Sequence, residues 1–137
     1  EDLKKGVYCL AGANGLGKST FLNLLNYGLT GIVLDSKQEV ITPDEIFKSN
    51  KRQTLRYFGG RVDAKRKENA EIEITFIIND KFYRLVRGFT DTETLRELEI
   101  YQIINNKRTS VLDLTNKSPK ELNLIYKKKK VLNYEIY

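Results

Sequence analysis

A glycine-rich stretch near the start of the chain has the residue types and spacing needed for chemistry on a phosphate group. It reads GANGLGKST, residues 12–20, and follows the pattern G-x(4)-G-K-S. Glycines let the backbone curl so that successive N–H groups point inward, and the start of a following helix adds partial positive charge. We expect the amides from about Asn14 to Thr20 to surround a phosphate. The stretch therefore predicts a P-loop.

Three side chains at the end of this loop have separate predicted roles. Lys18 should reach the β- and γ-phosphates of a nucleotide, and the Ser19 hydroxyl should bind Mg²⁺. Thr20 is expected to contact the α-phosphate. The alternative is a glycine-rich turn that happens to precede a lysine. The predicted binding residues are Gly12, Asn14, Gly15, Leu16, Gly17, Lys18, Ser19 and Thr20, with Ser19 as the metal ligand.

A P-loop requires a buried strand before it and a helix after it. Residues 7–11 form a short apolar run of the kind found in a central parallel strand, in which Cys9 is interpreted as a small core residue. After the loop, apolar residues recur at helical spacing, and Gly28 stands where a helix would end. These apolar residues are Phe21, Leu24 and Leu25. We therefore expect a strand, loop and helix over residues 6–28.

Further along the chain the apolar residues alternate with a period of two. The run AEIEITFII, residues 70–78, has the pattern of a half-buried strand and is followed by the turn residues Asn79 and Asp80. The segments at 81–89 and 98–104 read as a second and a third strand, and the residues after Asn105 and Asn106 as a weak fourth. The pattern predicts an antiparallel meander over about residues 70–112.

Both prolines mark predicted helix starts. In the segments TPDE, residues 42–45, and SPKE, residues 118–121, a hydroxyl residue precedes proline and a glutamate follows, as in a capping box. Helices should therefore begin near Pro43 and Pro119. The apolar face of the second is expected to contain Leu122, Ile125 and Tyr126.

The stretch GANGLGKSTFLNLL resembles the amino-terminal half of an ABC-type ATPase head. More narrowly it is similar to the SMC-like group, which includes double-strand-break-repair and chromosome-maintenance ATPases. The hairpin over residues 70–89, with Arg87 near its end, is also similar, so the resemblance covers about residues 5 to 90. It implies an α/β P-loop NTPase fold, with residues 1–137 as the amino-terminal lobe of a split head that has an antiparallel β-subdomain and flanking helices.

The same resemblance implies ATP and Mg²⁺ as cofactors, and partners that complete the site. In SMC-like heads a coiled coil separates this lobe from a carboxy-terminal lobe, and two heads form a homodimer with ATP between them. The chain begins with Glu1, so we expect it to be a piece of a longer protein. A nuclease or accessory subunit is a further expected partner. The sequence leaves open whether the process is DNA repair, chromosome maintenance or anti-phage defence.

The catalytic residues of this ATPase class are missing from the sequence. No hydrophobic run ends in Asp-Glu, and no LSGG-like signature is present. Asp35 follows an apolar run, as a Walker B aspartate does, but Ser36 stands where the class has glutamate. Gln102 is a poor candidate for the Q-loop glutamine, because it falls inside a predicted strand instead of following one. We predict no catalytic residue in this segment. It should bind ATP and Mg²⁺ but not hydrolyse ATP alone, and be an enzyme only as part of the complete protein.

The net charge of +6 favours anionic partners. The hypothesis drawn from it, and from the resemblance, is contact with the phosphate backbone of double-stranded DNA. The alternative is a solvated loop and a solvated helix end. The residues concerned are Arg61, Lys65, Arg66, Lys67, Lys127, Lys128, Lys129 and Lys130.

Composition excludes several other classes of protein. The chain has no histidine, which removes histidine triads and histidine-ligated zinc. A single cysteine excludes an internal disulfide and favours a cytoplasmic location, associated with the nucleoid in a bacterium. No apolar run approaches the ~20 residues of a membrane span, so no membrane partner is expected.

Two alternative functions remain. The first is another P-loop enzyme, such as a small kinase or a GTPase. Residues 116–119 come nearest to the guanine-binding N-K-x-D motif but lack its aspartate. The second is a module in which ATP binding gates an interaction without hydrolysis.

Overall fold

The computed structural model describes residues 9, 11, 12, 17–33, 54, 56–59, 61–63 and 65–128. Their regular elements are α1 (Lys18–Thr30), β1 (Glu71–Ile78), β2 (Lys81–Gly88), β3 (Glu97–Ile104), β4 (Lys107–Ser110) and α3 (Pro119–Lys128). The strands form one sheet in the order β1-β2-β3-β4, with every neighbouring pair antiparallel. The predicted meander is therefore confirmed.

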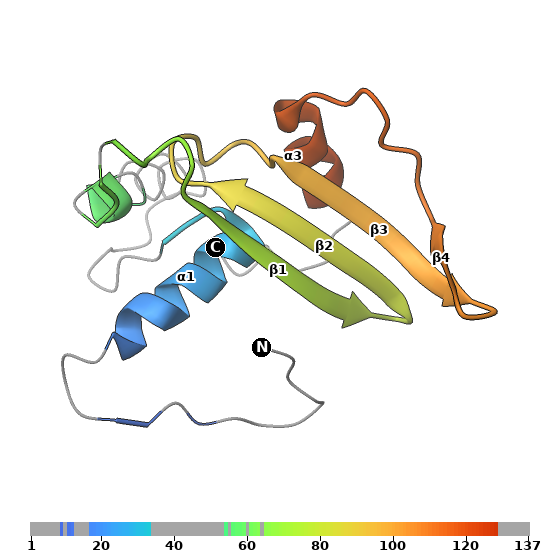
Figure 1. Ribbon diagram of the computed structural model, residues 1–137, viewed down its shortest axis with the longest axis horizontal. Helices are drawn as coiled ribbons and strands as arrows, with labels where there is room; N and C mark the ends of the chain where they lie inside the picture. The colour runs from blue at the N-terminus through green and yellow to red at the C-terminus, as the bar shows by residue number, and fades with distance from the viewer. Residues whose placement is uncertain are drawn as a thin grey trace, which may run out of the picture.

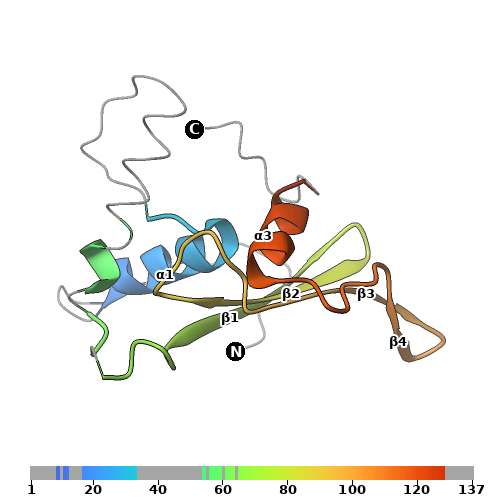
Figure 2. The same cartoon turned by 90° about the horizontal axis from the view of Figure 1, so that it is seen from above.

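The sheet and the two helices form two layers. Figures 1 and 2 show that α1 and α3 lie on the same face of the sheet, with α1 across β1 and β2 and α3 near β3. Two tight turns at one end of the sheet set its register. Asn79 and Asp80, and likewise Asn105 and Asn106, have positive φ, as two-residue hairpin turns require.

The face of the sheet beneath the helices is apolar because alternate side chains point to it. On this face Ile74 pairs with Leu85, and Leu85 pairs with Leu98. The main core cluster consists of Tyr83, Leu85, Leu95, Leu98, Ile100, Leu122 and Tyr126. The opposite face carries an ion-pair cluster, in which Arg84 on β2 bridges Glu73 on β1 at 2.8 Å and Glu97 on β3 at 2.5 Å.

Helix α1 extends past the residue at which the sequence predicted its end. It continues to Thr30 and is capped by Gly31, which has φ 79° and donates its N–H to the Tyr27 carbonyl at 2.7 Å. The prediction that Gly28 ends the helix is wrong. Gly28 is buried inside the helix, and a Cβ there would collide with the side chain of Ile74. Its lack of a side chain lets the helix lie close to the sheet.

The carboxy-terminal end of α1 is fixed by polar groups from the sheet and from α3. The Arg87 guanidinium, only 1% exposed, lies 3.4 Å from the Gly28 carbonyl and 3.2 Å from Asn123 Oδ1 on α3. The Tyr126 hydroxyl donates to the Leu29 carbonyl at 2.7 Å. The last carbonyls of a helix lack partners within the helix and carry partial negative charge. A buried cation and a hydroxyl satisfy them here.

A second cluster of aromatic rings fills the space beside this junction. Tyr27 on α1 stacks on Phe89 with a centroid distance of 5.3 Å, and Phe58 lies 4.7 Å from each ring. The Tyr27 hydroxyl donates to the Gly88 carbonyl. Burial raises the pKa of Tyr27 to about 12, although the Arg87 charge opposes that rise. Tyr27 therefore stays neutral at physiological pH.

Other predictions about individual elements have mixed outcomes. The helix predicted at Pro119 is confirmed as α3, with Ser118 Oγ accepting the Glu121 amide at 3.2 Å. Cys9 and Ala11 are exposed and belong to no strand, so Cys9 is not the core residue that its apolar surroundings predicted. A central strand is buried by neighbouring strands, and no strand among the described residues pairs with either residue.

Two further predictions concern residues that the structure does not describe. These are the apolar run that ends at Asp35 and the helix start at Pro43. No helix in the described part of the chain combines the length and apolar character needed to cross a bilayer.

Replacement of Gly31 by alanine should destabilise the protein by about 1 to 2 kcal/mol, because alanine resists the left-handed conformation. The added Cβ would also approach the Thr92 carbonyl and Arg87 Nη1, each at 3.0 Å. Urea unfolding measures the loss. The matched control is Gly59→Ala, at a helical position where a Cβ meets no atom of the described part of the chain within 4 Å. The control should be neutral or stabilising, and equal losses in both variants would contradict the capping role of Gly31.

Candidate phosphate-binding site

The first turn of α1 presents the predicted phosphate-binding residues that the structure describes. Gly17 precedes the helix with φ 83° and ψ 16°, a left-handed conformation that glycine adopts without strain. Its carbonyl accepts the Phe21 amide at 2.9 Å and so begins the helical ladder. No side chain among the described residues caps this end. The N–H groups at the start of α1 are thus left for a ligand, at the positive end of the helix dipole.

Lys18 reaches back to Gly12, where the glycine-rich stretch begins. Its ammonium group donates a hydrogen bond to the Gly12 carbonyl, six positions earlier in the chain. This contact joins the two ends of the loop and keeps the ammonium group beside it. Among the predicted residues the structure brings together Gly12, Gly17, Lys18, Ser19 and Thr20. Asn14, Gly15 and Leu16 lie outside the described residues.

The residues at the start of α1 fit a magnesium ion that is shared with phosphate. The Ser19 side chain is exposed in the first turn of the helix. Within the described ranges no three carboxylate or cysteine groups come together as a metal cage. Mg²⁺ keeps several waters and binds through one or two protein oxygens plus substrate phosphates. A single hydroxyl beside a phosphate site matches that requirement.

A tyrosine contacts α1 one turn further along. The Tyr57 hydroxyl accepts a hydrogen bond from Asn23 Nδ2 at 3.1 Å, and the Thr20 side chain lies beside it. The Arg61 guanidinium lies over the Tyr57 ring, 3.8 Å from its centroid. Partial burial raises the pKa of Tyr57, but the hydrogen bond from Asn23, the neighbouring Thr20 hydroxyl and the charge of Arg61 outweigh it and lower the pKa overall.

The sequence did not predict this tyrosine as part of the site. Tyr57 and Asn23 are 34 positions apart, and the segment between them has no motif that pairs them. The one local signal is the pattern of residues 56–59 and 61, where two basic residues flank aromatic ones. That pattern, taken alone, indicates a basic surface and not a contact with α1.

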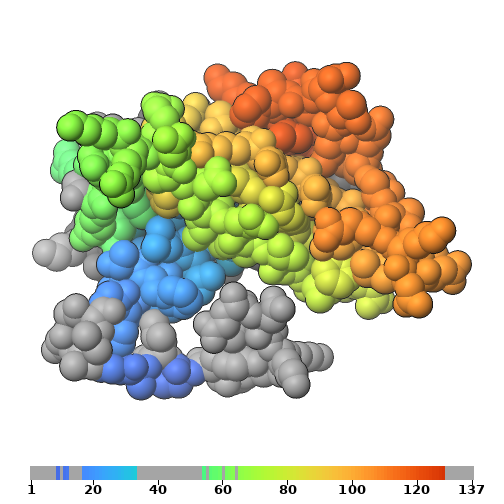
Figure 3. All heavy atoms as spheres, in the orientation of Figure 1, coloured from blue at the N-terminus to red at the C-terminus, as the bar shows by residue number. Residues whose placement is uncertain are grey.

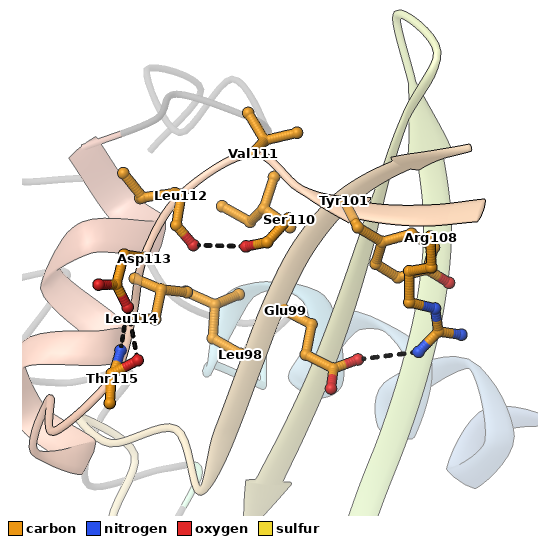
Figure 4. Close-up of a pocket in the computed structure, with 11 residues that line it drawn as sticks. Leu98, Glu99, Tyr101, Arg108, Ser110, Val111, Leu112, Asp113, Leu114 and Thr115 are labelled. Carbon is orange, nitrogen blue, oxygen red and sulfur yellow. Dashed lines mark hydrogen bonds and ion pairs between the residues drawn. The ribbon is translucent and has the colours of Figure 1, made fainter. Parts of the chain in front are cut away.

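A groove of about 620 Å³ lies at the other side of the molecule, beside β3 and β4, and is not suited to phosphate (Figure 4). Its walls include Leu98, Leu112 and Leu114. The cation that lines it, Arg108, is 3.4 Å from Glu99 and lies over the Tyr101 ring. Strand β4, beside the groove, is remote from the start of α1 in both views of the fold. We therefore place the candidate site at α1.

The basic residues predicted to contact DNA belong to two separate parts of the fold. Residues 65–67 lie in turns before β1, where Lys65 and Arg66 are exposed and Lys67 is half-buried. Lys127 and Lys128 end α3. Lys129 and Lys130 lie outside the described residues. Arg61 is exposed, and its guanidinium donates to the Tyr57 carbonyl at 2.9 Å.

Comparison with known proteins agrees with the geometry at α1. A protein family described as an AAA domain matches residues 2–136, nearly the whole chain, and the chain therefore belongs to this family. The protein is thus an AAA-type P-loop ATPase domain, a class that binds nucleotide, typically with Mg²⁺. Its α/β structure, with an antiparallel sheet and helices, is consistent with that class. No curated protein matches the sequence.

Replacement of Gly17 by alanine should weaken nucleotide binding about fivefold or more. A left-handed alanine costs roughly 1 to 2 kcal/mol, which would shift the loop away from its binding conformation. Among the described residues, no atom beyond its chain neighbours lies within 4 Å of the added Cβ, so the loss would reflect backbone conformation and not a collision. Gly17→Asn is the control, because asparagine tolerates this conformation better than alanine. Titration calorimetry with Mg-ATP measures both, and an equal loss for the two variants would contradict this explanation.

Proposed function

We propose that the chain is the ATP-binding lobe of an SMC-like ATPase head that couples Mg-ATP binding and hydrolysis to the binding or processing of DNA. The observation that carries this proposal is the combination of a glycine loop opening α1 with an antiparallel meander packed against the same helix. The meander comes after the P-loop helix in the chain, with the helical residues 56–59 between them, and this order supports the resemblance drawn from the sequence.

In this proposal each residue at the start of α1 binds a different part of Mg-ATP. The main-chain amides of residues 14–20 surround the β- and α-phosphates, and Lys18 exchanges its bond to the Gly12 carbonyl for the β- and γ-phosphates. Ser19 provides one oxygen to Mg²⁺, which balances the phosphate charge when bound. Thr20 contacts the α-phosphate. These groups bind and orient ATP but include no base to activate a water.

Hydrolysis therefore requires residues from elsewhere. Phosphoryl transfer needs an aligned water and positive groups that stabilise the developing charge. We propose that a carboxy-terminal lobe and a second head, bound face to face across the nucleotide, provide them. The exposed Phe21 and Leu22, about half accessible on α1, are available for contact with such a neighbouring surface. A nuclease or accessory subunit would complete the protein complex.

We further propose that the basic residues contact the phosphate backbone of double-stranded DNA. Lys65 and Arg66 are exposed in the turns before β1, and no acidic side chain among the described residues forms an ion pair with either of them. The proposed set also includes Arg61, Lys67 and Lys127 to Lys130. Such contacts would depend on salt and would select no base sequence.

Titration calorimetry with Mg-ATP tests the nucleotide-binding part of the proposal. Lys18→Ala should weaken binding by about tenfold to a hundredfold, since it removes a charge-assisted hydrogen bond. The control is Lys120→Ala, at an exposed lysine in the first turn of α3, which should bind normally. The chain alone should not turn ATP over. Hydrolysis by the chain alone at an ordinary enzymatic rate, abolished by Lys18→Ala, would contradict the split-head proposal.

Fluorescence anisotropy with duplex DNA tests the second part of the proposal. Reversal of Lys65, Arg66 and Lys67 to glutamate should weaken binding, and the slope of log affinity against log salt should fall by about 0.9 for each phosphate that the variant no longer neutralises. The control reverses three exposed lysines elsewhere, Lys107, Lys117 and Lys120. Salt-independent affinity, or an equal weakening in the control, would reject the DNA surface.

A further inference from the structure

The helical residues 56–59 contact the phosphate-facing end of α1 through one side chain. The Tyr57 hydroxyl accepts a hydrogen bond from Asn23 Nδ2 at 3.1 Å, and the Thr20 side chain lies beside it. Thr20 and Asn23 are three positions apart, so they lie on one face of the helix in successive turns. The atoms of this segment lie beside those of α1 in the space-filling view (Figure 3). Tyr57 thus contacts the first two turns of α1, directly after the glycine-rich stretch.

The Tyr57 ring is held by contacts that do not involve its hydroxyl. The Arg61 guanidinium covers the ring at 3.8 Å and donates to the Tyr57 carbonyl at 2.9 Å. The Phe58 ring meets the Tyr57 ring edge to face at 5.0 Å, and Phe58 itself packs on Tyr27 of α1. The direction of the hydroxyl is therefore fixed by packing and by a cation–π contact.

We propose that Tyr57 is a positioning residue of the nucleotide site, whose hydroxyl orients the Thr20 side chain and the first turns of α1 toward the phosphates. The Tyr57 hydroxyl accepts from Asn23 and has one proton of its own. With a nucleotide bound, it can donate that proton to Thr20 Oγ1, which leaves the Thr20 O–H for a phosphate oxygen. The inference rests on the proposed function, because without a nucleotide at the loop Tyr57 would serve packing alone.

The chain contains a second tyrosine that serves as a matched control. Tyr101 on β3 is covered by Arg108 at 4.1 Å and stacks on Phe82 at 5.0 Å. It has the same kind of cation–π contact as Tyr57 but lies on the face of the sheet opposite the helices. Tyr101→Phe therefore removes a hydroxyl from a similar environment and leaves the contacts of α1 unchanged.

The experiment measures binding to the whole protein with two probes, Mg-ATP and inorganic triphosphate, which has no base. Tyr57→Phe keeps the ring and its packing but removes the hydroxyl. It should weaken binding of both probes by about threefold to tenfold, the effect of one net hydrogen bond, while Tyr101→Phe leaves both unchanged. Asn23→Ala removes the partner of the hydroxyl instead and should weaken binding in the same direction.

A double-mutant cycle separates positioning from general stability. If Tyr57 acts through Thr20, Tyr57→Phe should have little further effect on affinity in a Thr20→Val background. Unchanged affinity in Tyr57→Phe, or a full additional weakening on top of Thr20→Val, would overturn the inference. Failure of the wild-type protein to bind either probe would reject the proposed function itself. Normal wild-type binding with an unaffected Tyr57→Phe would reject only the role of Tyr57.

Discussion

The buried guanidinium of Arg87 is the interaction on which the rest of the structure depends. A charge removed from water is costly unless surrounding groups bond to it, and here the carbonyls of Gly28 and Thr94 and the side chain of Asn123 do so. These groups belong to α1, to the segment before β3, and to α3. One side chain from β2 therefore connects both helices to the sheet. Its positive charge also faces the negative end of the α1 dipole.

This junction gives α1 two different ends. The carboxy-terminal end is closed, since Gly31 caps it and Arg87 and Tyr126 bond to its last turn. The amino-terminal end is open, with no side-chain cap from the described residues and with Lys18 bonded to the Gly12 carbonyl. A helix held firmly at one end can present its other end to a phosphate without moving, and such preorganisation lowers the cost of binding. The glycine at position 28 serves the same purpose by letting α1 lie directly on the sheet.

The sequence predicted those parts of the fold that have local causes. The alternation in β1 identified its buried face, and the asparagine turns placed the hairpins, because both signals lie within a few residues. The loop at α1 was predicted for the same reason. The end of α1 was not, because a glycine packed against a strand and a glycine that caps a helix look alike in sequence. The contacts of Arg87 with Gly28 and Asn123 span 59 and 36 positions, so no local pattern reveals them. The contact of Tyr57 with α1 escaped prediction for the same reason.

Nucleotide should bind at the open end of α1 while the sheet and the Arg87 junction stay as they are. Amide hydrogen exchange read by mass spectrometry, with and without Mg-ATP, measures both parts of the molecule at once. ATP should slow exchange in peptides that contain residues 17–22 and leave exchange in β1 to β4 unchanged. Unchanged exchange at the start of α1, with new protection beside β3 and residues 111–115, would contradict it.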